Sequence, residues 1–492
     1  MEVPTLQTLP TEILHTILEE LRLSANADSE TVTSTEYSDF SRRCALSIAT
    51  VSRRLRLATA PWTFSTVHNL NAGNRESSSS VPPTSLWRFV RALYVRDYSY
   101  VQERPIPVDN TLLGTLENMP VLTTVTLYLR RAVPPDFFYA LGALTTLSAL
   151  HIYQAQIDDG RLDRSLMRFE SLQSLTLRIA GPTTVARAPD VDTNTEQQNI
   201  HQILLSIKWP RLATLTMTEH PPLQHLPLSV LLLRMPALSD LSLLFTPDAH
   251  HQAQRFPPFY LVSPTDSLPI LDNLRSLAIS NCAFEDPLLR KLPRSLTSLK
   301  LLALWDVLDP DFPPWPIDGL GFMREFRPPQ ARWALLFDQV GTLPALTTLY
   351  VTIGEFAPLA SFVDAIAAFA PALHTLEIRF PAPDEPERLM MVDLTQGEPL
   401  FAALRTLPLR HLCLFTDYIY AGMHPGPPAH SAYQLLAELP GLETITYRFG
   451  GWYSRESDTV EFVWGRGMLG RPPPPRAIRH VDQHAFAPEY VP

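Results

Sequence analysis

The feature that most constrains how this chain can fold is a short phrase that recurs along its 492 residues. An apolar residue is followed, three and five positions later, by two more apolar residues. The first residues of its twelve copies are Val90, Leu122, Leu147, Leu172, Leu212, Leu238, Leu274, Leu296, Leu346, Leu373, Leu409 and Leu442. Residues two apart on a β-strand lie on the same face, so each copy predicts a short strand with one apolar face. A single unit cannot bury that face alone, but stacked units can, and the phrase therefore predicts a repeat architecture.

Proline occupies a fixed place beside half of these copies. The chain has 48 prolines and 18 glycines, so proline is about twice as common as in an average protein, whereas glycine is scarcer. Six prolines stand two residues before the first apolar residue of a copy: Pro120, Pro210, Pro236, Pro344, Pro371 and Pro440. Helix-like stretches precede the phrase at 200–209, 361–370 and 431–439. Because proline disfavours helix in the residue before it, this order predicts a crossing from helix to strand and hence a parallel β–α coil.

The copy at 274–284, LRSLAISNCAF, resembles the leucine-rich repeat. Its consensus positions are filled by Leu274, Leu277, Ile279, Cys282 and Phe284. The other copies mostly lack the Asn or Cys of that consensus, so the resemblance is to degenerate repeats. We expect an α/β solenoid, a leucine-rich-repeat-like parallel β–α coil, over residues 86–455, with a C-terminal tail at 456–492. The alternative is a set of unrelated helices and strands in an α/β enzyme.

The first seventy residues follow a different pattern. In LQTLPTEILHTILEELRL (6–23) apolar residues recur at helical spacing, and Pro10 suits the first turn of a helix. Residues 40–67 predict two more short helices. The polar segment NAGNRESSSSVPPTS (71–85) has the composition of a linker. We therefore expect a small all-α module at 1–70 in front of the solenoid.

This module resembles the F-box, through which substrate receptors dock on the Skp-type adaptor of cullin ubiquitin ligases. The opening L-P-x-E-[IL]-[IL] of that family is matched by Leu9, Pro10, Glu12, Ile13 and Leu14. Its later V-C-[KR]-x-[WF] segment is represented by Val51, Ser52, Arg53 and Leu55, where Ser52 and Leu55 depart from the usual Cys and aromatic residue. The chain is similar to the divergent F-box proteins of filamentous fungi.

The F-box resemblance implies partners and contact residues. The partners would be a Skp-type adaptor and, through it, a cullin. The adaptor-binding residues would be Leu9, Pro10, Ile13, Leu14, Ile17, Val51 and Leu55. The chain would be no enzyme, because its contribution is to hold a target beside the ubiquitin-charged enzyme. In the alternative interpretation, the N-terminal helices only cap the solenoid.

A candidate substrate surface comes from the third, fifth and seventh positions of each copy, which alternate with the apolar ones. Tyr and Arg, the residues enriched in interface hot spots, recur there. They are Tyr94, Arg96, Tyr128, Tyr153, Arg178, Tyr350, Arg379 and Arg448. We predict that this group binds a protein substrate. The alternative is that these are ordinary solvated strand residues.

The remaining signals bear on cofactors and compartment. A net charge of -10 argues against nucleic-acid and membrane partners. Three cysteines make no disulfide framework, and the absence of a signal peptide or a long apolar run predicts an intracellular protein of the cytoplasm or nucleus. We expect no cofactor, because the glycine motif GRGMLG (465–470) is followed by prolines and not by a helix. His411 and Cys413 are too few ligands for zinc and are expected to be small surface side chains.

These observations predict the substrate-recognition subunit of a Skp–cullin–F-box ubiquitin ligase, which docks on the adaptor through the F-box and binds a protein target through the repeats. Two alternatives remain. One is a leucine-rich-repeat scaffold for protein interactions. The other is an activator of a small GTPase, which would require an exposed loop arginine at a nucleotide.

Overall fold

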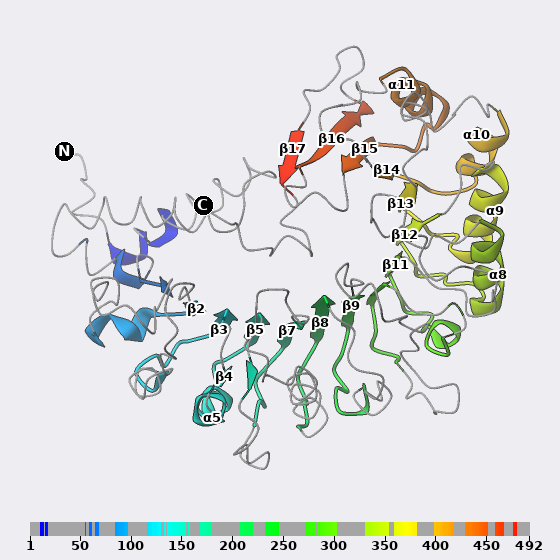
Figure 1. The fold of residues 1–492 in the computed structure, drawn as a ribbon. Coiled ribbons are helices and arrows are strands. Elements are labelled where there is room, and N and C mark those ends of the chain that lie inside the picture. Colours follow the sequence, from blue (N-terminus) through cyan, green and yellow to red (C-terminus); the bar gives the residue numbers. More distant parts are fainter. Residues whose placement is uncertain are drawn as a thin grey trace, which may run out of the picture. The chain divides into compact units, whose positions relative to one another are not determined.

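The computed structural model divides the chain into two compact units (Figure 1). Unit 1 comprises Met1–Ala180 and Arg187–Leu212, and unit 2 comprises Gly181–Ala186 and Ala213–Pro492. The structure describes residues 10–13, 15–17, 55, 59–61, 64–67, 84–96, 116–128, 132–133, 135–153, 156–157, 168–179, 207–219, 232–245, 271–280, 284, 286–302, 330–353, 359–380, 398–417, 429–450, 458–466 and 476–479.

The described part of unit 1 is built on parallel strands. In sheet order they are β1 (Thr66–Val67), β2 (Ala92–Arg96), β3 (Thr124–Tyr128), β5 (Ala149–Tyr153) and β7 (Ser174–Ile179). A separate parallel pair joins β4 (Ala132–Val133) to β6 (Gln156–Ile157). The helical elements are the 3-10 helix η2 (Thr84–Phe89) and the α-helix α5 (Pro135–Ala143).

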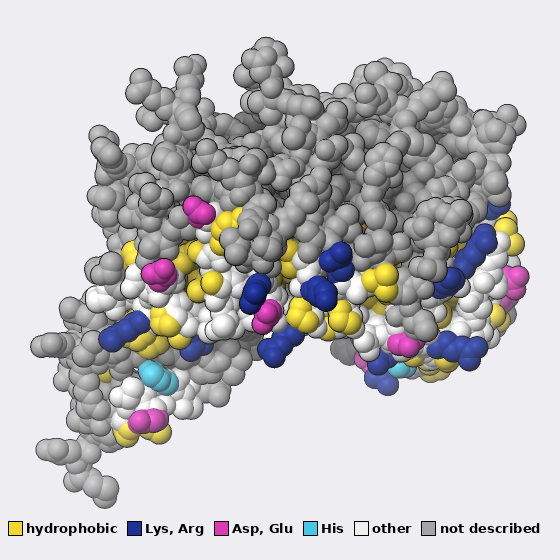
Figure 2. All heavy atoms as spheres, turned by 90° about the horizontal axis from the view of Figure 1, so that it is seen from below, with side chains coloured by type: hydrophobic (Ala, Val, Ile, Leu, Met, Phe, Trp, Pro, Cys, Tyr) yellow, Lys and Arg dark blue, Asp and Glu magenta, His cyan; other side chains and the backbone are white. Residues whose placement is uncertain are grey.

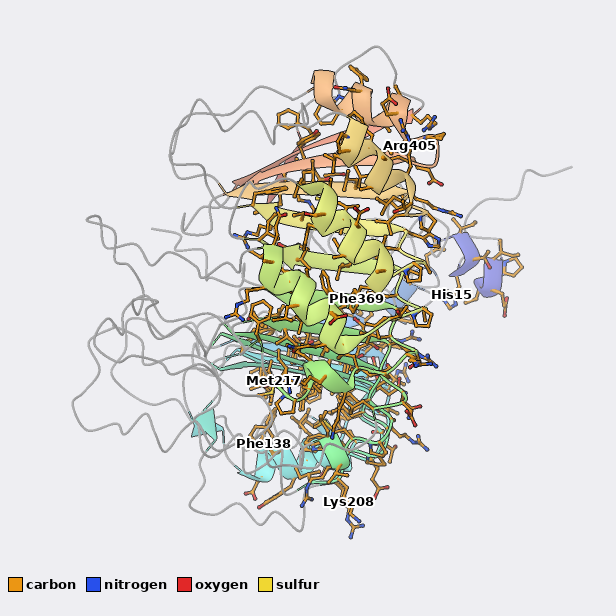
Figure 3. The ribbon with its side chains drawn as sticks, turned by 90° about the vertical axis from the view of Figure 1, so that its right-hand side faces the viewer. His15, Phe138, Lys208, Met217, Phe369 and Arg405 are labelled. Carbon is orange, nitrogen blue, oxygen red and sulfur yellow. The ribbon has the colours of Figure 1, made fainter. Side chains whose placement is uncertain are left out.

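Unit 2 continues the same pattern with more helices. Its parallel strands, in sheet order, are β8 (Thr214–Glu219), β9 (Asp240–Phe245), β10 (Ser276–Ser280), β11 (Ser298–Leu302), β12 (Thr348–Thr352), β13 (Thr375–Phe380), β14 (His411–Asp417) and β15 (Thr444–Gly450). Two antiparallel strands follow, β16 (Asp458–Gly465) and β17 (Arg476–Arg479). The helices are η5 (Leu289–Lys291), α8 (Gln330–Val340), α9 (Leu359–Phe369), α10 (Glu398–Arg405) and α11 (Ala429–Glu438). Helices α8, α9 and α10 stack side by side along one side of the sheet (Figures 1 and 3).

Every copy of the repeated phrase forms a strand, so each unit is an α/β solenoid-like fold. Each strand from β2 to β15, the short pair β4 and β6 excepted, begins two residues after the first apolar residue of a copy. The apolar residues then align in register. In unit 2 one such row consists of Leu215, Leu241, Leu277, Leu299, Leu349, Leu376, Leu412 and Ile445, each at most 3% exposed. Unit 1 has the matching row Leu93, Val125, Leu150 and Leu175. The predicted repeat is therefore confirmed within each unit.

The recurring prolines take the second position of a β-turn that leads into the strand. The amide of Leu122 donates to the carbonyl of Met119 at 3.1 Å, which makes Pro120 the second residue of the turn. The same bond closes the turns that contain Pro210, Pro236, Pro344, Pro371 and Pro440. Proline is favoured at this position because its fixed φ suits the turn and its missing N–H is not required there. Proline therefore specifies this turn as well as the end of a helix.

Of the three stretches predicted to be helical, two are confirmed, as α9 and α11. Residues 200–206 of the third lie outside the described residues, and 207–209 are not helical. In α9 the buried side chains recur at helical spacing: Leu359, Phe362, Val363, Ile366 and Phe369. The ring of Phe369 stacks on Phe337 of α8, with 4.5 Å between centroids (Figure 3). Helix α9 thus packs part of its buried face against α8 of the preceding repeat.

A second hydrogen-bond pattern joins consecutive repeats and explains many of the Ser and Thr residues. The carbonyl of Arg275 accepts hydrogen bonds from the amides of Thr297 and Ser298, at 2.8 and 3.0 Å, and from the hydroxyl of Thr297 at 2.9 Å. Hydroxyls at the same position of other copies donate to the preceding repeat in the same way: Thr123, Ser148, Ser239 and Thr347. A hydroxyl at this position therefore strengthens the link between neighbouring turns.

Residues 65–67, within the segment predicted as the N-terminal module, form the edge of the unit 1 sheet. The amides of Arg91 and Ala92 donate to the carbonyl of Ser65, at 2.7 and 2.9 Å, which repeats the pattern between copies. Leu55 and Val67 are buried, with exposures of 1% and 5%. This segment covers the first strand of the solenoid and leaves less of it unpaired.

Residues predicted to form the C-terminal tail end the unit 2 sheet. Strand β16 pairs antiparallel with β15, and β17 pairs with β16. Arg466, which directly follows β16 within the glycine motif, donates to the carbonyls of Leu436 and Leu439 at 3.1 and 2.6 Å. A guanidinium at these last carbonyls stabilises the end of α11. The described part of the glycine motif therefore has a structural use.

Candidate binding surfaces

An exposed apolar pair marks the N-terminal helical segment. Residues 11–13 and 15–17 are helical, and Pro10 precedes them. Ile13 and Ile17 are 46% and 38% exposed. Residues four apart lie on the same side of a helix, so the two isoleucines form one apolar strip. Large apolar side chains at these exposures are uncommon among the described residues of the chain.

The other residues predicted to bind the adaptor differ in position. Leu9, Leu14 and Val51 lie outside the described residues. Pro10 is exposed and begins the helical segment. Leu55 is 1% exposed, so its side chain belongs to the core of unit 1 and not to an accessible surface. The motif alone predicted a surface contact by Leu55 and gave no sign that this side chain is buried.

The outward positions of unit 1 bring four of the predicted substrate residues into one row. Position 96 pairs with 128, 128 with 153, and 153 with 178 across β2, β3, β5 and β7. The side chains of Arg96, Tyr128 and Arg178 lie outside what the structure describes. Tyr153 is half-buried, and its ring stacks on that of His151, with centroids 6.4 Å apart and planes at 9°. Sequence positions far apart are thus neighbours at the ends of four strands.

Tyr94 lies two residues before position 96 and is also half-buried. Its register partner on β3 is Thr126, followed by His151 on β5 and Thr176 on β7. Burial lowers the pKa of His151 below the usual 6.5, so its imidazole is neutral near pH 7. The described side chains of this face are therefore uncharged and partly aromatic.

In unit 2 the predicted residues are engaged within the chain itself. The ammonium of Lys300 lies 4.8 Å from the ring centroid of Tyr350 on the next strand. The guanidinium of Arg379 lies 4.8 Å from the ring centroid of Phe415, and Arg379 is only 7% exposed. Cation–π contacts of this kind are favourable when both groups are partly desolvated. Arg379 therefore contributes to the fold more than to an open surface.

Arg448 joins three strands through two carboxylates. Its Nη1 lies 3.2 Å from both carboxylate oxygens of Glu377 on β13, and its Nε donates to Glu461 Oε2 on β16 at 3.1 Å. The side chains are 26%, 18% and 12% exposed, for Arg448, Glu377 and Glu461. Pairs with this little exposure are screened weakly by water. The cluster ties the antiparallel strand β16 to the parallel repeats.

Cys413 was expected to be a surface side chain, and this expectation is wrong. It is 8% exposed and lies on β14, which the Arg448–Glu377 ion pair spans. Burial raises the pKa of the Cys413 thiol, and the charge of Glu377 raises it further. The thiol is therefore protonated at neutral pH and is a poor nucleophile.

His411 on the same strand hydrogen-bonds to Thr444, with 2.7 Å between Nδ1 and Oγ1. In the described part of the chain no three His, Cys, Asp or Glu side chains come together as a metal site would require. None of the helices that the structure describes has the length and apolar composition needed to cross a bilayer.

Comparisons with known proteins give no family. No protein-family model matches the chain, and a search of curated proteins gives no match. Among solved structures, the chain is similar to one from the crystal structure of the Rad7 and Elc1 complex in yeast, with 12% identity and a TM-score of 0.34, over 90% of this chain and 93% of that one. A likeness at this TM-score carries no argument about fold or function.

Proposed function

We propose that this chain is an F-box-type substrate receptor with leucine-rich-repeat-like units, which docks on a Skp-type adaptor of a cullin ubiquitin ligase and binds a protein target through its repeats. The observation that carries the proposal is the exposed pair Ile13 and Ile17 on a helical segment that begins at Pro10. This segment is the one that carries the Leu-Pro-x-Glu opening of the F-box. It precedes a fold of stacked repeats, an architecture suited to binding proteins over an extended surface.

The energetics favour a partner for this helix. Burying one isoleucine side chain stabilises a complex by roughly 1.5–3 kcal/mol. Association itself costs several kcal/mol, so two isoleucines need the support of neighbouring anchors. The motif supplies candidates in Leu9 and Leu14. A solvent-exposed strip of this kind is typical of an interaction site when its partner is absent.

The capping alternative accounts for a different part of the N-terminal module. Leu55, Thr59 and Ala60 are buried, and Ser65 continues the hydrogen-bond pattern of the repeats. These residues do what a cap is expected to do. A cap gives no reason for Ile13 and Ile17 to be exposed. We therefore assign docking to the first helical segment and capping to Leu55, Thr59, Ala60 and residues 65–67.

As a receptor, the chain would carry out no chemistry and would act by proximity. A target bound to the repeats would be held near the ubiquitin-charged enzyme of the ligase. This raises the effective concentration of the target at that enzyme. The buried, protonated Cys413 is consistent with this role, because it is unsuited to nucleophilic catalysis.

The test is co-expression of the full chain with a Skp-type adaptor, followed by gel filtration and light scattering. We expect a 1:1 complex for the natural sequence. The double variant Ile13→Glu/Ile17→Glu should weaken adaptor binding by about 100-fold or more, because it removes two apolar anchors. The matched control is Leu233→Glu, since Leu233 is 64% exposed but lies in unit 2. A natural chain that forms no complex, or equal loss in the control, would contradict the proposal.

A further inference from the structure

We infer that the outward face of strands β2, β3, β5 and β7 binds a substrate segment that carries two acidic side chains about four residues apart when extended. That the bound segment belongs to a substrate rests on the proposed function.

The first support is the charge of the face. Its outward positions are Ala92, Tyr94, Arg96, Thr124, Thr126, Tyr128, Ala149, His151, Tyr153, Ser174, Thr176 and Arg178. Two are arginines and none is acidic, in a chain whose net charge is -10. The outward positions of unit 2 include Asp240 and Glu377. The side of the molecule drawn in Figure 2 likewise mixes Lys and Arg with Asp and Glu among its described residues. A face with cations and without acids is complementary to an acidic partner.

The second support is the spacing of the two arginines. Positions 96 and 178 occupy the same register row and are separated by β3 and β5. Three interstrand steps of about 4.8 Å place their backbones about 14 Å apart. An extended chain covers about 3.3 Å per residue, so about four residues span that distance. Two carboxylates at this spacing match one arginine each, and a guanidinium can bind a carboxylate through two parallel hydrogen bonds.

The third support is what lies between the arginines. Positions 128 and 153 of the row are both tyrosines, and His151 stacks on Tyr153. The rings of His151 and Tyr153 are only partly buried, so part of each is exposed. Because His151 of the neighbouring row is neutral near pH 7, the positive charge of the face comes from positions 96 and 178, the two ends of the row. The middle of the bound segment would therefore lie on aromatic, uncharged surface.

The experiment measures fluorescence anisotropy of labelled peptides with the purified full chain. One peptide of about ten residues carries two glutamates four positions apart in a Ser, Ala and Thr background, which matches the calculated span. A second has glutamine at both positions, and a third has the two glutamates adjacent. We expect the first peptide to bind about ten-fold or more tightly than either of the others.

Variants locate the site. Arg96→Gln/Arg178→Gln should remove the preference for glutamate. The matched control is Arg91→Gln/Arg168→Gln, because these exposed arginines precede the same two strands but lie outside the row. Thermal unfolding and adaptor binding verify that both variants are folded. Loss of the preference in the control to the same extent would overturn the inference.

The outcomes separate this inference from the proposed function. If no peptide with two glutamates binds, or all peptides bind equally, while the adaptor still binds, the inference is overturned and the receptor proposal stands. If the adaptor fails to bind but the glutamate preference persists and depends on Arg96 and Arg178, the face is an acid-binding surface and the receptor proposal is overturned.

Discussion

The two units carry arginine at the same strand position, yet the arginines have different neighbours. In unit 1, Arg96 and Arg178 stand in a row with two tyrosines and no acidic residue. In unit 2, Arg448 binds Glu377 and Glu461, and Arg379 lies over Phe415. The inward apolar rows of the two units are alike. A repeat therefore fixes the strand position of an arginine, while in unit 2 the residues of adjacent strands hold it within the fold.

This difference follows from how each set of strands ends. Unit 2 is closed by the antiparallel strand β16, which brings Glu461 opposite Arg448. The ion pairs therefore belong to a region where the parallel repeat stops. The row in unit 1 lies among parallel repeats, and no acidic residue occupies its outward positions. At the closure of unit 2, Arg448 is therefore held within the fold by the two carboxylates.

The largest expected effect tests whether the inward rows are equivalent. Leu150→Ala in unit 1 and Leu349→Ala in unit 2 should each lower the free energy of unfolding by about 3–4 kcal/mol, because both leucines are fully buried. Urea unfolding measures the change, and Leu233→Ala, at an exposed leucine, serves as the control. A large loss in one unit and little in the other would show that the rows are not equivalent.

Arg448→Met should be the next most destabilising change, at about 2–3 kcal/mol, because it removes the guanidinium that pairs with two largely buried carboxylates. The matched control is Arg410→Met. Arg410 lies 3.8 Å from Glu443, but the two side chains are 58% and 56% exposed, so we expect a loss of less than about 0.5 kcal/mol. Equal losses in the two variants would contradict an internal role for Arg448.

The turns before the strands should show smaller effects, which can be tested by removing proline from two turns and adding it to a third. Pro120→Ala in unit 1 and Pro344→Ala in unit 2 should each cost about 0.4–1 kcal/mol, because alanine makes the unfolded chain more flexible. Glu170 occupies the same turn position, since the amide of Leu172 donates to the carbonyl of Phe169. Glu170→Pro should therefore stabilise unit 1 by a similar amount, about 0.4–1 kcal/mol. Destabilisation by Glu170→Pro would show that this turn differs from the others.

The smallest effect concerns pH and unit 1. Burial places the pKa of His151 below 6.5 in the folded chain, so the unfolded chain binds a proton more readily. Stability from this residue is complete above pH 6.5 and falls as the pH drops toward the folded pKa. Urea unfolding at pH 7.5 and pH 5.5 should show a larger loss for the natural sequence than for His151→Gln. Equal losses would assign the pH dependence to other groups.

The sequence predicted the strands well because their determinants are local. Each phrase of six residues contains its own inward and outward positions, and proline marks the turn before it. Arg448 and Glu377 are separated by 71 residues, so nothing local to either residue indicates their ion pair. Cys413 stands in register between Glu377 and Thr446 of the adjacent strands, so its neighbours are also far away in sequence. Leu55 illustrates a related case, because a motif position expected at a surface is buried.

Hydrogen exchange of the full chain, measured by mass spectrometry with and without a Skp-type adaptor, tests the central claim most directly. We expect the adaptor to protect peptides covering residues 9–21, while the strands of both units exchange as they do without it. The exposed Ile13 and Ile17 lie at the centre of that segment. Protection confined to the strand faces, or no protection anywhere, would contradict docking through the first helical segment.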